Sequence, residues 1–389
     1  MLSDKSFPII EATLPIVGER MPGIAKNFYG RLFGAHPELL DGLFSRANQK
    51  NGSQQQALAG SVAGFAAHLI RNPDTYPEVM LSRIAHKHAS LGIAPEQYDV
   101  VYKYLFEAIA DELSDVLTSE IAAAWSEVYW LMAHALIKIE KGLYAEQANA
   151  KPWSPWTVVD KQPAGAAAMT FTLEPADDTP VTLAKPGQFV SVRVQLADGL
   201  RQVRQYSLSA ETSSRRRVFT AKRDDNGEVS PVLHRDIALG DVIEVSNPYG
   251  DVTLADGNAP LVLATAGIGC TPSASILRSL VEQKSDREVL VLHAERSLDQ
   301  WALKDQMNAD VEALTGAELR LWLEHPTGTA RPGFMSLKGL DIPDDASVYL
   351  CGPLPFMKNI RAEALAAGVP AERIHYEVFG PDLWMNSAN

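Results

Sequence analysis

The chain has 389 residues, of which 46% are apolar and 21% are charged. This length excludes a single small binding module, and this composition excludes a mainly disordered protein, because enough apolar surface is present to form two or three cores. The formal net charge of −13 argues against nucleic acid or an anionic membrane as the main partner.

The first part of the chain, up to about residue 147, has helical patterning. Apolar residues recur at spacings of three and four in the segments 55–69 and 121–144. Pro95 stands where the first turn of a helix tolerates proline, and Thr118 or Ser119 can cap the last long helix. We therefore expect an all-α domain here.

The pattern changes after a predicted linker at residues 147–155. Strand signals at 169–173, 188–194, 217–222 and 242–245 alternate with Gly and Pro, which predicts a small antiparallel barrel or sandwich. From residue 259, apolar runs at 261–265, 289–293, 319–323 and 347–350 alternate with helix-like segments, which is typical of a parallel α/β sheet.

The compartment is indicated by two further features. The N-terminus lacks the long apolar run of a signal peptide, and the longest uncharged run, 257–277, contains glycines and prolines that favour strand, loop and helix start over a membrane span. The only two cysteines, Cys270 and Cys351, indicate a reducing compartment without a structural disulfide. We expect a cytoplasmic protein that needs no membrane.

Four short motifs follow one another in the last two thirds of the chain. They are Arg204-Gln205-Tyr206-Ser207, Gly227-Glu228-Val229-Ser230, Gly267-Ile268-Gly269-Cys270-Thr271-Pro272 and Cys351-Gly352-Pro353. A flavin needs an aromatic face, a donor at its reacting edge and a cation for its pyrophosphate. Glycines after a buried strand let backbone N–H groups approach a phosphate. Each motif alone also occurs as an ordinary strand edge or strand-to-helix turn.

In this order and spacing, the four motifs resemble the ferredoxin–NADP reductase family of flavoproteins. The resemblance implies that Arg204 meets the FAD phosphate, that Tyr206 packs on the flavin ring, and that Ser207 bonds near flavin N5. It places the chain end, His375 to Pro381, against the flavin, with Glu377 near the reacting edge and Phe379 near the ring. The alternative for that end is a closing edge strand with an aromatic residue in the core.

The residues that this resemblance assigns form two sets. The implied FAD set is Phe189, Arg204, Gln205, Tyr206, Ser207, Gly227, Val229, Ser230, Glu377, Val378, Phe379, Gly380 and Pro381. The implied NAD(P) set is Gly267, Ile268, Gly269, Cys270, Thr271, Pro272, Cys351, Gly352 and Pro353. Cys270 stands where many relatives carry a longer polar residue, and Phe189 stands where tyrosine is also common.

Two histidines of the N-terminal third are candidate axial ligands of a haem. His86 and His88 lie in one predicted helix, and Leu81 and Ile84 share the face of His88 but not that of His86. The spacing therefore favours His88, although a lone histidine on an apolar face is more often a core residue. His86 is expected at the surface.

Residues 1–147 look like a bacterial globin, and the whole chain resembles flavohaemoglobin. The matching stretches are 26–29, 43–52, 54–58, 84–88, 95–98 and Glu140. The resemblance implies that His88 is the proximal iron ligand and that Tyr98 and Glu140 are its hydrogen-bonded partners. It further implies a distal side and haem contacts made by Tyr29, Gln54, Leu58 and Phe44, with Lys87 beside the ligand.

The resemblance implies three domains and an electron path through them. The domains are an all-α globin at 1–147, an antiparallel β-barrel for FAD at 153–258, and an α/β nucleotide-binding domain at 259–389. NAD(P)H would reduce FAD, FAD would reduce a single haem b, and oxygen bound there would convert nitric oxide to nitrate. The implied activity is nitric oxide dioxygenation, with nitric oxide, oxygen and NAD(P)H as substrates. A monomer is the expected state, and the sequence itself leaves the oligomeric state open.

Two other functions remain open at this point. The first is an oxygen or nitric oxide carrier or sensor whose reductase only keeps the haem ferrous. The second is a flavin reductase with a haem-free helical regulator. The sequence leaves open NADH against NADPH, for which Arg296 is a candidate selector. It also leaves open side reactions with peroxide, lipid or quinone, and the tail after Pro381.

Overall fold

A computed structural model describes residues 1–210 and 216–382. The chain divides into two compact units. The first unit contains Met1–Pro152, Gln195–Val203 and the segment that begins at Pro381. The second contains Trp153–Val194 and Arg204–Gly380. The division of this second unit into separate FAD and nucleotide domains stays a prediction. The tail from residue 383, whose role the sequence left open, lies outside the described residues.

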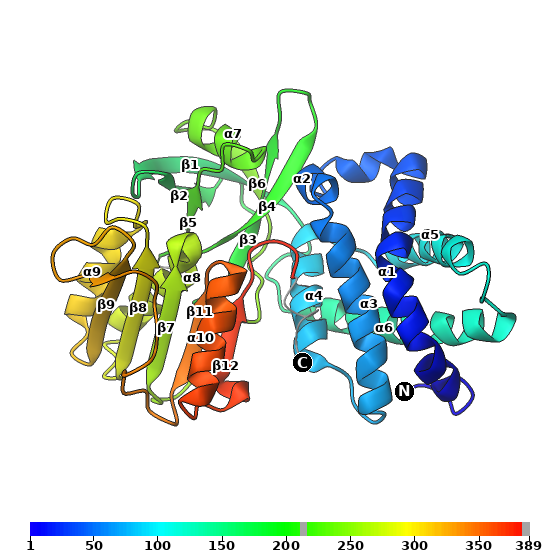
Figure 1. The fold of residues 1–389 in the computed structure, drawn as a ribbon. Coiled ribbons are helices and arrows are strands. Elements are labelled where there is room, and N and C mark those ends of the chain that lie inside the picture. Colours follow the sequence, from blue (N-terminus) through cyan, green and yellow to red (C-terminus); the bar gives the residue numbers. More distant parts are fainter. Residues whose placement is uncertain (211–215, 383–389) are drawn as a thin grey trace. The chain divides into compact units, whose positions relative to one another are not determined.

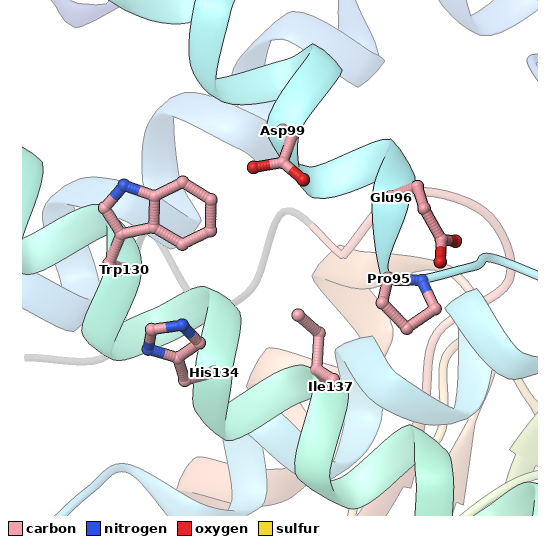
Figure 2. Close-up of a pocket in the computed structure, with 6 residues that line it drawn as sticks. All are labelled: Pro95, Glu96, Asp99, Trp130, His134 and Ile137. Carbon is pink, nitrogen blue, oxygen red and sulfur yellow. The ribbon is translucent and has the colours of Figure 1, made fainter.

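The first unit is helical, as its apolar spacing predicts (Figure 1). Thr118 is the N-cap of the last helix, where its hydroxyl accepts a hydrogen bond from the backbone N–H of Ile121 at 3.3 Å. Pro95 directly precedes the fifth helix, whose first turn lies opposite the middle of the sixth (Figure 2). The helices are α1 (Phe7–Ala35), α2 (Arg46–Lys50), α3 (Ser53–Arg71), α4 (Glu78–Leu91), α5 (Glu96–Glu112) and α6 (Ser119–Ala145), with a 3-10 turn at Pro37–Leu40.

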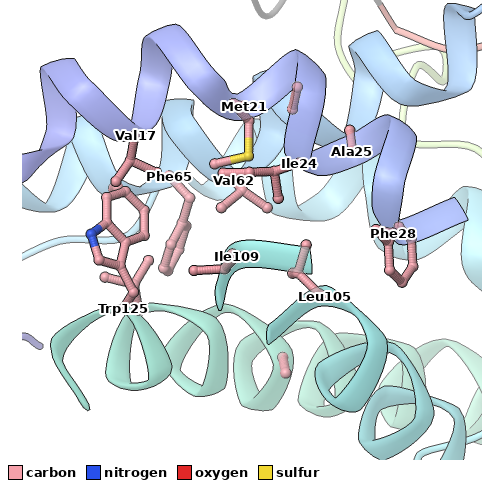
Figure 3. Close-up of a cluster of buried hydrophobic side chains, with 14 of the residues drawn as sticks. Val17, Met21, Ile24, Ala25, Phe28, Val62, Phe65, Leu105, Ile109 and Trp125 are labelled. Atoms are coloured by element: carbon pink, nitrogen blue, oxygen red, sulfur yellow. The ribbon is translucent and has the colours of Figure 1, made fainter. Parts of the chain in front are cut away.

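The core of the first unit lies between α1, α3, α5 and α6 (Figure 3). Met21 and Phe28 of α1, Phe65 of α3, Ile109 of α5 and Trp125 of α6 are all buried. Because these side chains repeat at helical spacing on each element, one apolar stripe per helix is enough to form the core.

The first sheet of the second unit is antiparallel in the pairings β1–β2, β1–β6, β2–β5 and β3–β6. The strand order is β4-β3-β6-β1-β2-β5. A bridge between Leu208 and Phe219, just after β4 and within β5, joins the two outer strands, so the sheet is barrel-like. This confirms the predicted antiparallel architecture. The elements are β1 (Ser154–Pro163), β2 (Ala168–Pro175), β3 (Phe189–Gln195), β4 (Arg201–Ser207), β5 (Arg217–Lys222), β6 (Val242–Val245) and the short helix α7 (Val229–Arg235).

The second sheet is parallel and follows the order β10-β9-β8-β7-β11-β12. The chain runs from β7 to β8 on one side and later places β11 on the other side, so the strand order reverses between β7 and β11. In open α/β sheets, ligands bind at the carboxyl ends of the strands at such a reversal. The elements are β7 (Leu261–Ala266), α8 (Cys270–Glu282), β8 (Val289–Glu295), α9 (Lys304–Ala313), β9 (Ala317–Leu323), β10 (Arg331–Pro332), β11 (Ser347–Cys351), α10 (Leu354–Ala366) and β12 (Ile374–Glu377), with 3-10 turns at Gly267–Gly269 and Ala371–Arg373.

Among the described residues, no helix combines the length and the apolar character needed to cross a bilayer.

Candidate functional site

Three predicted residues of the first unit form one hydrogen-bonded group. His88 near the end of α4 places its Nδ1 atom 2.9 Å from Glu140 Oε1 and 3.0 Å from the Tyr98 hydroxyl. The Tyr98 hydroxyl donates to the same carboxylate oxygen at 2.6 Å. Glu140 is only 2% exposed, so a carboxylate in a helix that would ordinarily face solvent is instead held inside. This contact orients the imidazole ring.

The imidazole of His88 fits the role of an iron ligand. Glu140 and Tyr98 both engage its Nδ1 atom, whereas Nε2 has no hydrogen-bond partner among the described residues. The side chain is 35% exposed, so this nitrogen can be reached. A carboxylate that accepts the Nδ1–H bond leaves Nε2 as the neutral electron donor that haem iron requires. His86 is half-buried, rather than fully at the surface as expected.

Two tyrosines that the sequence reasoning missed support this group. The Tyr129 hydroxyl of α6 donates to the carbonyl oxygen of Tyr98 at 2.6 Å, and the Tyr144 hydroxyl donates to that of Ile93 at 2.8 Å. Burial raises the pKa of the Tyr98 hydroxyl, and the charge of Glu140 raises it further. Tyr98 therefore stays a hydrogen-bond donor at neutral pH.

The predicted distal residues also lie together. Tyr29 is buried in α1, and its ring lies edge-on to Phe44 with centroids 6.0 Å apart. Burial raises the pKa of the Tyr29 hydroxyl, while a hydrogen bond with Gln54 acts in the opposite direction. The Tyr29 hydroxyl is therefore neutral and can donate to a bound ligand. Leu58 lies one turn after Gln54 on α3 and is half-buried, as is Lys87 on α4.

The flavin motif occupies the end of β4. Tyr206 stacks on Phe219 with centroids 5.0 Å apart and planes at 26°. The Gln205 side chain donates to the Ser191 hydroxyl at 3.2 Å, and Ser207 is buried. Tyr206 is half-buried, so β5 supports its ring while part of it stays exposed. An aromatic ring held in this way fits the packing surface that a flavin requires.

The other predicted flavin residues fall into three places. Burial lowers the pKa of Arg204, while the charges of Glu228 and Asp224 near Gly227 act against this shift. Ser230 at the start of α7 accepts from the backbone N–H of Asp224 at 3.0 Å. Val229 and Phe189 are buried, and Phe189 lies against Gly250, where an added Cβ would be 3.2 Å from its ring. The structure thus brings β4 and the start of α7 together through Arg204.

The chain end contains β12, an edge strand of the parallel sheet. A closing edge strand was one of the two alternatives for this segment. Its register pairs Glu377 with Cys351 of β11. Glu377 and Val378 are buried, but Phe379 is 47% exposed and does not lie in the core. Gly380 has a φ of 95°, and Pro381 follows it. Because the Phe379 ring is exposed, the structure does not support the alternative in which this strand places an aromatic residue in the core.

The predicted phosphate loop contains a very close approach between backbone segments. Gly269 precedes α8, and a Cβ there would lie 2.3 Å from the Cys351 carbonyl oxygen, so only glycine fits. Gly267 has a φ of +58°, which also favours glycine. Ile268, Thr271 and Pro272 complete the turn, and Pro353 precedes α10 as its N-cap. The loops after β7 and β11 therefore meet where the strand order reverses, with the N-terminus of α8 available to a phosphate.

A buried carboxylate beside this loop was missed by the sequence reasoning. Glu295, the last residue of β8, is 9% exposed, and its Oε1 accepts from the Arg296 N–H at 2.9 Å. Its Oε2 has no partner among the described residues and lies 3.8 Å from where a Gly267 Cβ would be. An acid that ends the second strand of a nucleotide fold is a signal that could have been read. Arg296, the candidate from sequence, is exposed.

Comparisons with known proteins agree with this geometry. The globin family profile matches residues 26–136, and the oxidoreductase NAD-binding domain profile matches residues 263–362. A flavohemoprotein of Rhizobium meliloti strain 1021 is 38% identical over 405 residues, covering 99% of this chain and 100% of that protein. One of Chromobacterium violaceum is 36% identical over 98% of both chains.

Comparison with solved structures also finds flavohemoglobin-like proteins. A crystal structure of flavohemoglobin from Malassezia yamatoensis, with bound FAD and heme, is 43% identical, has a TM-score of 0.94 and covers 97% of this chain and 100% of that one. The FAD/NAD-binding domain of a nitric oxide dioxygenase from Vibrio cholerae O1 biovar El Tor is 33% identical, has a TM-score of 0.56 and covers 59% of this chain and 99% of that one. The full-length relatives and the two profiles together show that the chain belongs to the flavohemoprotein family.

Proposed function

We propose that this protein is an NAD(P)H-dependent nitric oxide dioxygenase that carries one haem b and one FAD. The observation that supports it best is that one chain holds both a carboxylate-supported histidine, in His88 and Glu140, and a dinucleotide loop at Gly269 and Cys351. When bound, the haem would supply an iron that activates oxygen, and the flavin would convert a hydride into single electrons for it.

The residues of the first unit would prepare the iron site. His88 would hold the iron through Nε2, and Glu140 would increase the electron donation of the ring through Nδ1. On the opposite side, the neutral Tyr29 hydroxyl, in hydrogen-bond contact with Gln54, would donate to an oxygen ligand. Phe44 and Leu58 would exclude water, which strengthens these polar contacts.

The residues of the second unit would bind and orient the flavin and the nicotinamide. Tyr206 would pack on the flavin, Arg204 would pair with its phosphate, and Ser207 would donate at the reacting edge. Gly267 and Gly269 would let the dinucleotide phosphates approach α8. Glu377 pairs in register with Cys351, so the chain end and the Cys351 loop would border the same nicotinamide position.

Catalytic turnover distinguishes this function from a carrier or sensor. Holoprotein with NADH and oxygen should remove many equivalents of nitric oxide per haem, because the second unit returns electrons after each cycle. Nitric oxide consumption measured with an electrode, together with nitrate formation, tests this. Consumption that stops at one equivalent per haem would support the carrier.

Tyr29→Phe tests the distal hydroxyl, because it keeps the ring and removes only the hydroxyl. We expect faster oxygen dissociation, with flavin reduction unchanged.

We further propose that Glu295 makes NADH the preferred cosubstrate. Its Oε2 atom lies beside Gly267 and has no hydrogen-bond partner among the described residues. This oxygen can accept a ribose hydroxyl, whereas a 2′-phosphate would bring a second negative charge to it. Glu295→Gln should therefore raise kcat/KM for NADPH by about tenfold relative to NADH, equivalent to about 1.4 kcal/mol. Stopped-flow flavin reduction with both nucleotides measures this, with Arg296→Gln as the comparison. If only the Arg296 variant changes the ratio, Arg296 is the selector.

We also propose that the protein acts as a monomer in the cytoplasm. In support, both cysteines are free and buried, as in proteins of reducing compartments.

A further inference from the structure

A pocket on the first unit is lined by residues that have no role in the site described above. It has a volume of about 570 Å³, is wide open to solvent, and lies between the first turn of α5 and the middle of α6 (Figure 2). A pocket of this size falls in the range of small-molecule sites, which is about 300–1,000 Å³. Its lining residues are Pro95, Glu96 and Asp99 on one side and Trp130, His134 and Ile137 on the other.

The α6 side of this pocket is an aromatic wall. The Trp130 and His134 rings lie with centroids 5.4 Å apart and planes at 31°. Trp130 also packs against Tyr102, with centroids 5.2 Å apart, and against Tyr129, with centroids 5.3 Å apart. The indole is therefore held in place before any ligand arrives, which lowers the entropic cost of binding on its face.

The α5 side carries two exposed carboxylates. Among the described residues, neither Glu96 nor Asp99 has an ion-pair or hydrogen-bond partner. Figure 2 shows Asp99 across from the rings of α6, and Glu96 farther along the pocket, beside Pro95. A cation between the two walls would meet an aromatic face and negative charge together, which is the arrangement that recognises organic ammonium groups.

The chemistry of the lining selects among cations. The described residues contain no group of three or more His, Cys, Asp or Glu side chains that could hold a metal ion. Pro95 and Ile137 add apolar surface, which favours a nitrogen that carries alkyl groups, because such a nitrogen is less strongly hydrated than a bare ammonium. We infer that the pocket between α5 and α6 binds a small, free organic cation with an alkylated ammonium group.

The pocket adjoins the group that orients His88. Asp99 follows Tyr98 in α5, and the Tyr98 carbonyl accepts from Tyr129. Ile137 lies three residues before Glu140 on α6. A ligand that contacts both helices would therefore stabilise the start of α5, where the proximal hydrogen bonds begin. We expect slower backbone hydrogen exchange over residues 96–99 when the pocket is filled.

Choline and its neutral isostere 3,3-dimethyl-1-butanol provide the test. Calorimetric titration of the haem- and FAD-loaded protein, at about pH 8 so that ordinary imidazoles are neutral, should show choline binding. The isostere should bind at least about tenfold more weakly, because the charge supplies the main attraction. The slower hydrogen exchange over residues 96–99 should appear with choline and not with the isostere.

Variants separate this site from a helix-terminus effect. The double variant Glu96→Gln, Asp99→Asn should lose choline binding by about tenfold or more. Glu120→Gln is the matched control, because Glu120 is likewise an acid in the first turn of a globin helix and does not line the pocket. Equal binding of choline and isostere, absence of choline binding, or an equal loss in the Glu120 variant would each overturn the inference.

Discussion

Replacing His88 with alanine should remove the haem from the purified protein and leave the flavin chemistry intact. In the group formed by His88, Tyr98 and Glu140, only His88 has a ring nitrogen that can bind a metal. This nitrogen is Nε2, because Nδ1 is already engaged by Glu140 and Tyr98. The loss of the axial ligand should lower the Soret absorbance per protein by about tenfold or more, because mutation of even the outer-shell partners of a metal ligand costs about 10- to 100-fold in metal affinity.

His86→Ala is the matched control for this experiment, because it lies on the same helix two residues earlier. It should keep the Soret band. Flavin reduction by NADH should stay within about twofold in both variants, since the flavin and nucleotide residues lie in the second unit. Haem retained by the His88 variant but lost from the His86 variant would reverse the assignment, and loss of both cofactors would indicate misfolding.

Gly269→Ala should abolish most hydride transfer. The new methyl carbon would lie 2.3 Å from the Cys351 carbonyl oxygen and 2.7 Å from the Gly352 backbone nitrogen, which are backbone atoms that cannot rotate away. The loops after β7 and β11 would have to separate, at a cost of about 1–3 kcal/mol in unfolding free energy. Because a displacement of about 1 Å can cost about 100-fold in rate, flavin reduction measured by stopped flow should fall by at least that factor.

The control for this substitution is Gly142→Ala. Gly142 lies in α6, and a Cβ there would meet no atom within 4 Å. The change should stabilise the helix by up to about 1 kcal/mol and leave hydride transfer unchanged. A Gly269 variant with the normal rate of flavin reduction would show that the two loops are not in contact during the reaction.

The architecture was predictable because the helical part, the antiparallel sheet and the parallel sheet each repeat one simple pattern. The 217–222 run predicted β5 with its bounds, and the 121–144 run predicted α6 within two residues at either end. Tyr98 and Glu140 could be assigned only through the family resemblance, because they are 42 residues apart and no local pattern links a tyrosine on α5 to a carboxylate on α6.

The remaining features depend on packing that a sequence does not show. Glu295 matters because one of its oxygen atoms is buried with no partner within the described part of the chain, and burial is a property of the folded chain. The rings of Tyr102 and Trp130 approach each other across two helices, so the pocket beside them had no signature in either helix. The same reasoning applies to Phe379, whose exposure could not be read from its apolar character.

The burial of the two thiols has a consequence for the nitric oxide dioxygenase function proposed above. Burial raises the pKa of Cys270 to about 12, and it also raises the pKa of Cys351, with the charge of Glu377 adding to that shift. The thiolate is the form that oxidants and nitrosating agents attack, and at neutral pH almost none is present at either position. The Cys270 Sγ atom also donates to the Ala302 carbonyl at 3.4 Å. The nucleotide loop therefore places sulfur beside its own redox chemistry in a form that this chemistry does not damage.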